Sequence, residues 1–173
     1  MAEPVQKGQA ADGFGIVLWI PGADAIADVN APTEAELALG ERLTYGLTAD
    51  GFNHGASVAK VESSRYTLAQ ALTYDGVITD TVTLRYVYNR ETPTDAETIL
   101  STPGEDGFLV HALGYPNGHE LEAGDVINAV IPVTTSVSTD VPPTQNSELV
   151  KEQTPNVRGE VGREVTVAAG GGA

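Results

Sequence analysis

Short runs of β-branched and aromatic residues, separated by turn signals roughly every 8–15 residues, recur along almost all of this 173-residue chain. The densest run is Val77–Asn89, which is rich in Val, Thr and Tyr. Ile16–Ile20, closed by Pro21-Gly22, and Gly107–Gly114 are further predicted strands. Such a series predicts a mainly β fold, an antiparallel sandwich or barrel, because no long helical pattern interrupts it.

Other strand-like segments are less regular. Asp125–Val141 reads as one long strand that could bend at Pro132, and Val157–Val167 alternates valines with polar residues. Arg42–Leu47 and Ala56–Glu62 are shorter strand candidates. Turns are expected at Thr48–Gly55, which contains Asp50-Gly51, and at Tyr74-Asp75-Gly76.

One short helix is expected to pack outside the sheets. Thr94 can cap it, acids occupy its first turn, and Ala96, Ile99 and Leu100 form an apolar stripe before Pro103-Gly104 ends it. Pro32–Leu37 predicts a single helical turn, and Asn146–Gln153 could hold another.

The chain reads as a single domain over residues 14–168, with flexible ends at 1–13 and 169–173. A domain of this length buries about 70% of the surface of its unfolded chain, so it can fold around its own core. There is no cysteine, which excludes disulfides and thiolate metal sites. The polar start and the shortness of the apolar runs indicate neither a signal peptide nor a membrane span, so no membrane binding is expected.

Charge is the strongest compositional signal. The chain has 24 acidic and 9 basic residues, a formal net charge of −15. Such a surface repels phosphates and disfavours tight binding of nucleic acid. It is compatible either with solubility alone or with a surface that faces DNA without adhering to it.

Motifs for catalysis or for cofactors are missing from the sequence. His54, His111 and His119 have no metal-ligand spacing, and no Gly-x-Ser-x-Gly or phosphate-binding loop occurs. We therefore predict no catalytic, cofactor-binding or metal-binding residue. A carboxylate pair acting in an enzyme remains an alternative, although scattered acids usually form solvated faces.

The order of several segments resembles one protein family. Ala31–Thr44 is similar to the Pro-Thr-x-x-Glu-Leu-x-x-Gly-x-x-Leu-Thr stretch near the start of major tail proteins of siphophages, especially those of actinobacteria. Similar stretches follow in the family's order at Leu47–Phe52, Leu84–Asn89, Asp95–Leu100, Gly107–Val110, Ala123–Val126 and Glu148–Gln153. Together they span roughly residues 15–168, and no one of them is diagnostic by itself.

This resemblance implies a sandwich or half-barrel with a helix on the outer side, as in the phage tail tube fold. It also implies a structural virion protein of the tail, assembled in the cytoplasm of the host bacterium. Six copies would form a ring with a continuous inner barrel, and rings would stack into a tube through which double-stranded DNA passes. The tape-measure protein, a tail terminator and baseplate proteins are the implied partners.

The two long segments, Val77–Asn89 and Asp125–Val141, are candidates for the inner barrel. Candidate lumen-facing residues on the polar faces of the strands are Thr79, Thr81, Thr83, Asn128, Thr134, Ser136, Ser138, Asp140, Glu160 and Glu164. A solvated outer face is the alternative for each of them. Asp80 falls out of this polar phase and could lie at a bend or at a junction between subunits.

Contacts between rings are expected from the N-terminal residues 1–13 and from the loop Thr48–Gly55. The candidate residues in that loop are Asp50, Gly51, Phe52, Asn53 and His54. Alternatives to a tail tube are a head-decoration protein, a tail terminator, a head–tail connector and, from a different class, a β-sandwich binding module.

Overall fold

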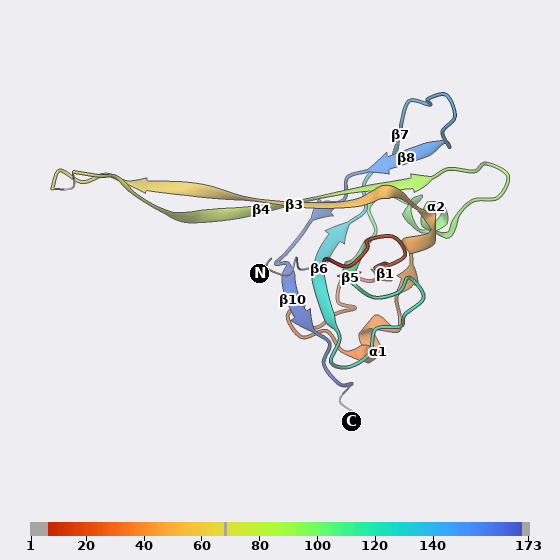
Figure 1. Cartoon of the computed structure of the whole chain (residues 1–173), viewed down its shortest axis with the longest axis horizontal. Coiled ribbons are helices and arrows are strands. Elements are labelled where there is room, and N and C mark those ends of the chain that lie inside the picture. The colour runs from red at the N-terminus through yellow and green to blue at the C-terminus, as the bar shows by residue number, and fades with distance from the viewer. Residues whose placement is uncertain (1–6, 68, 171–173) are drawn as a thin grey trace, which may run out of the picture.

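The computed structural model describes residues 7–67 and 69–170, which form two antiparallel sheets and two short α-helices (Figure 1). One sheet has the strand order β10 (Gly162–Thr166), β6 (Val126–Thr134), β5 (Asp106–Leu113), β1 (Gly15–Pro21) and β2 (Glu41–Arg42), with β9 (Asn156–Val157) paired to β6. The other has the order β3 (Leu47–Ser63), β4 (Leu72–Val87), β8 (Val150–Gln153) and β7 (Thr139–Asp140). The predicted β-sandwich is confirmed.

Strand β1 is buried on both of its faces. Ile16, Leu18 and Ile20 pack into one apolar core, and Val17 and Trp19 pack into a second core on the opposite side of the sheet. This double burial explains the unbroken apolar run, because alternation with polar residues is expected only where one face meets water.

The second core lies between the two sheets. Val82, Leu84 and Tyr86 of β4 are almost fully buried there and meet residues of β5 and β6 from the facing sheet. The first core lies on the other side of the six-stranded sheet, under Ile26 and Leu37. The four-stranded sheet thus covers one face of the six-stranded sheet and leaves its own outward face free.

Both predicted helical turns around Pro32–Leu37 and Thr94 are confirmed. Helix α1 (Glu34–Leu37) begins with a capping box, in which Thr33 accepts from the Glu36 N–H and Glu36 accepts from the Thr33 N–H. Helix α2 (Asp95–Leu100) is capped by Thr94 and buries Ala96 and Leu100. No helix in the described part of the chain is long and apolar enough to cross a membrane.

Strands β3 and β4 extend far beyond the sandwich as a two-stranded hairpin, visible at the left of Figure 1. We call residues 56–79 the arm. Most of its described residues are exposed, whereas Val82 at its base is fully buried. The arm absorbs the predicted strand Ala56–Glu62, and the turn expected at Tyr74–Gly76 is wrong because these residues lie inside β4.

The turn expected in Thr48–Gly55 is also wrong, because this segment belongs to β3. The register shifts between Leu47 and Phe52, so Asp50-Gly51 forms an irregularity within a strand instead of a reversal of the chain. Gly51 is required there, since a Cβ would lie 2.6 Å from the Arg85 carbonyl oxygen.

The single strand expected over Asp125–Val141 is two strands in different sheets. β6 continues through Pro132, whose carbonyl accepts from the Arg158 N–H at 3.0 Å, and ends at Thr134. Thr135 then bonds through its backbone to Gly104 and Glu105, and the chain crosses to β7 in the other sheet. The break therefore comes from tertiary contacts of Thr135 and not from Pro132.

Three further segments differ from expectation. Arg42–Leu47 divides between β2 and a 3₁₀ turn at Thr44–Gly46, and the helical turn expected in Asn146–Gln153 is absent because its end forms β8. Val157–Val167 divides into β9 and β10 because the chain passes from one core to the other: Val161 lies between the sheets and Val165 in the first core. Residues 1–6 and 171–173 of the predicted flexible ends lie outside the described residues.

Candidate assembly surfaces

The outward face of the four-stranded sheet is mainly polar, and its charged side chains gather in one ion-pair network around Arg85. Residues paired across antiparallel strands share a face. The pairs on this face are Asn53 with Thr83, Gly55 with Thr81, and Ser57 with Thr79. The structure therefore brings the predicted threonines of β4 together with Asn53, and they point away from the core that holds Val82 and Leu84.

Arg85 lies on the same face, within an ion-pair network. Its Nε donates to Glu152 at 2.5 Å and its Nη1 donates to Asp50 at 2.7 Å. Hydrogen bonds to Glu152 and Asp50 raise the pKa of Arg85. Hydrogen bonds from Thr48 and Arg85 lower the pKa of Asp50. Because two carboxylates neutralise Arg85, this guanidinium is not a free cation for a phosphate.

The other predicted lumen residues do not join this face. Asn128 and Thr134 belong to the six-stranded sheet, where the Asn128 amide donates to Glu164 at 3.0 Å and Thr134 donates to Asp106 at 2.5 Å. Asp140 pairs with Lys151, which places it opposite to the Arg85 face. Ser136 and Ser138 lie between β6 and β7, and Glu160 lies between β9 and β10. The two segments expected to form one inner barrel are thus only partly in one sheet: β6 lies in the six-stranded sheet, and only the short β7 shares the sheet of β4.

The five residues expected in a ring-stacking loop occupy different environments within β3. Gly51 is buried, Asn53 lies on the outward face, and Phe52 packs against the core between the sheets. Asp50 binds Arg85, as described above. His54 lies on the core-facing side of β3 at the base of the arm, paired with Val82 and in contact with Asp80.

Asp80 joins the two sheets where the arm leaves the sandwich. Its Oδ1 accepts from Arg163 Nη2 of β10 at 2.5 Å and from His54 Nε2 of β3 at 2.8 Å. Burial opposes ionisation of Asp80, but the hydrogen bonds from Arg163 and His54 outweigh it and lower its pKa. The sequence pattern does not predict this cluster. Its signal is a single acid in the apolar phase of a strand, and its main partner is 83 residues away.

His111 of β5 also faces the core between the sheets, next to the same cluster. Its ring lies against Phe52, with 4.3 Å between the ring centroids. Burial, together with the charge of His54, lowers the pKa of His111 to about 4. His111 is therefore neutral at pH 7.

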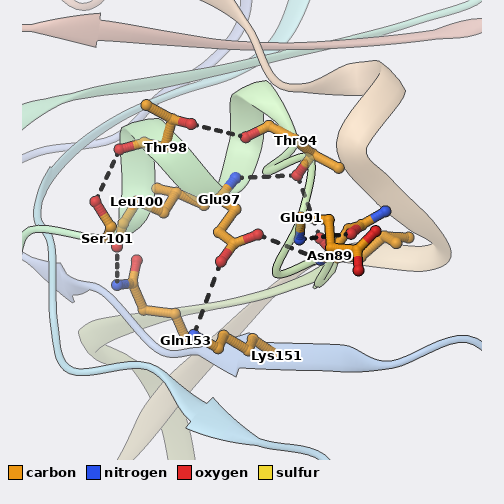
Figure 2. A network of polar contacts seen from close by, with 10 residues as sticks. Asn89, Glu91, Thr94, Glu97, Thr98, Leu100, Ser101, Lys151 and Gln153 are labelled. Carbon is orange, nitrogen blue, oxygen red and sulfur yellow. Dashed lines mark hydrogen bonds and ion pairs between the residues drawn. The ribbon is translucent and has the colours of Figure 1, made fainter.

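Helix α2 is fastened to the four-stranded sheet by polar contacts (Figure 2). The Gln153 amide donates to the Leu100 carbonyl at 3.1 Å, and Lys151 lies 4.0 Å from Glu97. Glu97 also receives the Asn89 N–H at 3.4 Å. These contacts fix the helix against β8, on the side of the sheet opposite to Arg85 and Glu152.

The described residues contain no group of three or more His, Asp or Glu side chains that could hold a metal ion. His54 and His119 each bind one carboxylate, from Asp80 and Asp125 respectively. The polar side chains are instead spread over a sheet face and a projecting hairpin. Their arrangement is typical of a structural protein that contacts other chains over extended surfaces.

Comparison with known proteins identifies the kind of structural protein. The family model described as "Phage tail tube protein" matches residues 3–170, and the chain belongs to this family. It is a structural, non-enzymatic component of the virion tail. This membership decides against the alternatives of a head-decoration protein, a tail terminator, a head–tail connector, a binding module and an enzyme. No curated protein matches the chain.

A solved structure has the same fold. The chain is similar to one in the cryo-EM structure of the anti-feeding prophage baseplate, 6-fold symmetrised, with a TM-score of 0.52. The sequence identity is 8%, and the match covers 90% of this chain and 97% of that chain. At this identity the likeness establishes the fold.

Proposed function

We propose that six copies of this chain close into a ring, that the rings stack into the tail tube of a siphophage, and that genomic DNA passes through the lumen. Family membership and the likeness to a chain of a six-fold baseplate support this number of copies. Ring closure also pairs the free edges of sheets, which otherwise expose unpaired N–H and C=O groups. The tape-measure protein, the terminator and baseplate proteins are its proposed partners.

The outward face of the four-stranded sheet is the proposed lumen wall. The observation that carries this proposal is its chemistry: hydroxyl and amide side chains around one arginine that Asp50 and Glu152 neutralise. Unpaired lysine or arginine side chains on the wall would bind DNA phosphates, and each such contact would strengthen the binding electrostatically. A neutral to acidic wall gives moving DNA few points of adhesion.

This proposal narrows the candidate lumen residues. Thr79, Thr81 and Thr83 remain on the proposed wall, joined by Asn53. Asn128 and Thr134 belong to the six-stranded sheet, and Asp140 lies on the opposite face of the four-stranded sheet. We therefore assign these three residues to contacts outside the lumen. Glu160 and Glu164 are exposed around β10, and we likewise assign them to the outer surface.

Electron microscopy of the purified protein tests the assembly. We expect hollow tubes or six-fold rings. Isolated monomers or trimers at all concentrations would contradict the proposed function.

Opposite charges introduced at one position test the lumen wall. We expect Thr81→Lys to leave tube assembly intact but to slow DNA ejection from phage particles, whereas Thr81→Glu leaves ejection unchanged. Thr98→Lys, on the exposed side of α2, is the matched control for an added lysine elsewhere. Equal ejection by particles carrying Thr81→Lys and Thr81→Glu would place this face outside the lumen.

A further inference from the structure

We propose that two side chains, those of Thr44 and Asn117, close the free edge of β1 against strand addition. Copies of this chain can then join by strand pairing only through the four-stranded sheet. The partner concerned is a second copy of this chain, and the outcome prevented is its attachment to the β1 edge of the six-stranded sheet. This inference rests on the proposed self-assembly and names residues that restrict which edges take part in it.

Strand β1 has the composition of a strand that attracts other strands. Ile16–Ile20 is an unbroken apolar run, mostly β-branched or aromatic, without charge or proline. This pattern is typical of segments that aggregate by strand pairing when their edge is open. The edge partner of β1 is β2, which has two residues and pairs only with Leu18 and Trp19. The earlier residues of β1 therefore need another cover on this side.

Thr44 occupies the place of a strand residue beside Val17. Its hydroxyl accepts from the Val17 N–H at 2.9 Å and donates to the Val17 carbonyl at 3.3 Å. A residue on an antiparallel neighbouring strand makes the same two bonds with its backbone groups. The Leu43 N–H, 2.9 Å from the same carbonyl oxygen, adds a third bond. Both edge groups of Val17 are thus occupied within the single chain.

Asn117 covers the next position of the edge in the same way. Its Oδ1 accepts from the Gly15 N–H at 3.2 Å, and its backbone N–H donates to the Gly13 carbonyl at 3.0 Å. Because hydrogen-bonding directions alternate along a strand, the N–H groups of Gly15 and Val17 point to the same side. One residue of the loop between β5 and β6 therefore supplies both a donor and an acceptor, as a neighbouring strand would.

Arg42 fastens the two covering segments to each other. Its Nη1 donates to the Asn117 carbonyl, and its Nη2 donates to the His119 carbonyl at 2.9 Å. Arg42 belongs to β2 and adjoins the segment that carries Thr44, whereas Asn117 lies 75 residues farther along the chain. We call residues 41–44 and 115–119 the edge cover, because this guanidinium holds them together against β1.

The other edges of the two sheets are covered to different extents. At the far edge of the six-stranded sheet, β10 has five residues, and Glu164 within it has a φ of +49°. Short, irregular edge strands disfavour pairing. Beyond β10, Ala168 donates to the Pro32 carbonyl at 2.8 Å and accepts from the Glu34 N–H at 3.2 Å. By contrast, β3 has 17 residues and, within the described chain, pairs only with β4. Strand pairing between copies is thereby directed to the four-stranded sheet.

Removal of both side-chain acceptors tests the edge cover. In the double variant Thr44→Val with Asn117→Leu, we expect the amide protons of Gly15 and Val17 to exchange at least about tenfold faster in the monomer, because they lose their acceptors. Hydrogen exchange followed by NMR measures this. At higher concentration we expect irregular aggregates at the expense of tubes, visible by electron microscopy. In these aggregates the same two amides become protected again, since another chain has paired with the edge.

Two controls separate an opened edge from a loss of stability. Thr135→Val removes a hydroxyl that accepts the Glu105 N–H at 2.8 Å, away from the edge of β1. We expect it to lower stability, measured by urea unfolding, without forming the aggregates. Asn117→Asp keeps an acceptor oxygen, and we expect it to assemble like the wild type. If the double variant does not fold, Asn117→Leu alone, at a half-buried loop position, replaces it in the test.

The outcomes distinguish the inference from the proposed function. Normal tube formation by the double variant while both amides exchange rapidly would overturn the inference, and so would unchanged exchange of the two amides. The same aggregates from Thr135→Val would show that lost stability is their cause. If the wild-type protein forms no rings or tubes, the proposed function is wrong, and aggregation of the double variant relative to the wild type still tests the edge cover.

Discussion

At the scale of single residues, Asp80 links the two sheets at the base of the arm. Its side chain is 10% exposed and accepts hydrogen bonds from Arg163 and His54, which belong to different sheets. It therefore holds the base of the arm against β10. Because its pKa is lowered in the folded protein, its contribution to stability is present above the ordinary carboxylate pKa and is lost as pH falls through the folded value.

Replacing Asp80 tests this role. We expect Asp80→Asn to lower the free energy of unfolding by about 1–2 kcal/mol, since hydrogen bonds to charged groups are lost. Asp75→Asn removes a carboxylate from the exposed Lys60 pair and is the matched control, with an expected change below about 0.5 kcal/mol. Urea unfolding of the monomers measures both. Equal changes in the two variants would show that Asp80 has no special role.

The lowered pKa of His111 predicts that the free energy of unfolding depends on pH. Its pKa is about 4 in the folded protein and about 6.5 when unfolded, so the unfolded chain binds the proton more readily. Stability from this residue is complete above pH 6.5 and falls as pH drops toward 4. From pH 7 to pH 5 the loss is about 2 kcal/mol.

The variant His111→Leu removes this titration. We expect it to unfold with nearly the same free energy at pH 7 and pH 5, apart from changes due to other groups, when both are measured in urea. A wild-type protein and a variant that lose the same stability on acidification would indicate that His111 titrates normally.

At the scale of elements, the described residues of the arm and residues 7–12 contribute no side chain to either core. Residues 7–12 are exposed, and Gln9 donates to the Gly114 carbonyl at 3.0 Å. A function in contacts between rings remains our prediction for residues 1–13.

Deletion of residues 2–12 separates folding from assembly. We expect a folded monomer with nearly unchanged thermal unfolding but with impaired polymerisation, because the exposed residues 7–12 contribute little to the monomer and more to an interface. Circular dichroism and electron microscopy measure the two properties. Tubes of normal length from the truncated protein would rule out this function for the segment.

At the scale of the whole molecule, net charge opposes assembly. Copies with a charge of −15 repel over distances set by the salt concentration, about 30 Å at 0.01 M and about 8 Å at 0.15 M. In the proposed tube, contacts between copies must overcome this repulsion.

Salt should therefore promote tube formation. We expect the critical concentration for assembly, measured by sedimentation, to fall several-fold between 10 mM and 150 mM sodium chloride as repulsion is screened. Sodium sulfate at equal ionic strength controls for the identity of the salt. A critical concentration that rises with salt would instead indicate interfaces held mainly by opposite charges.

Local patterns in the sequence were sufficient to predict several helices and strands. Ile16–Ile20, Gly107–Gly114 and most of Val77–Asn89 are strands, and Thr94 caps a helix, as predicted. The order of segments was also sufficient to predict the family. In each case the residues that form the signal lie close together in the chain, so their spacing carries the information.

Only the tertiary structure decided how these elements combine. Thr48–Gly55 and Tyr74–Gly76 carry turn signals, yet cross-strand pairing keeps both in one hairpin. Asp125–Val141 looks continuous, but contacts of Thr135 with residues 30 positions away divide it between two sheets. The link from Asp80 to Arg163 spans 83 positions. A local pattern fixes which side chains share a face, whereas partners distant in the sequence decide what that face meets, because their contacts form only when the chain has folded.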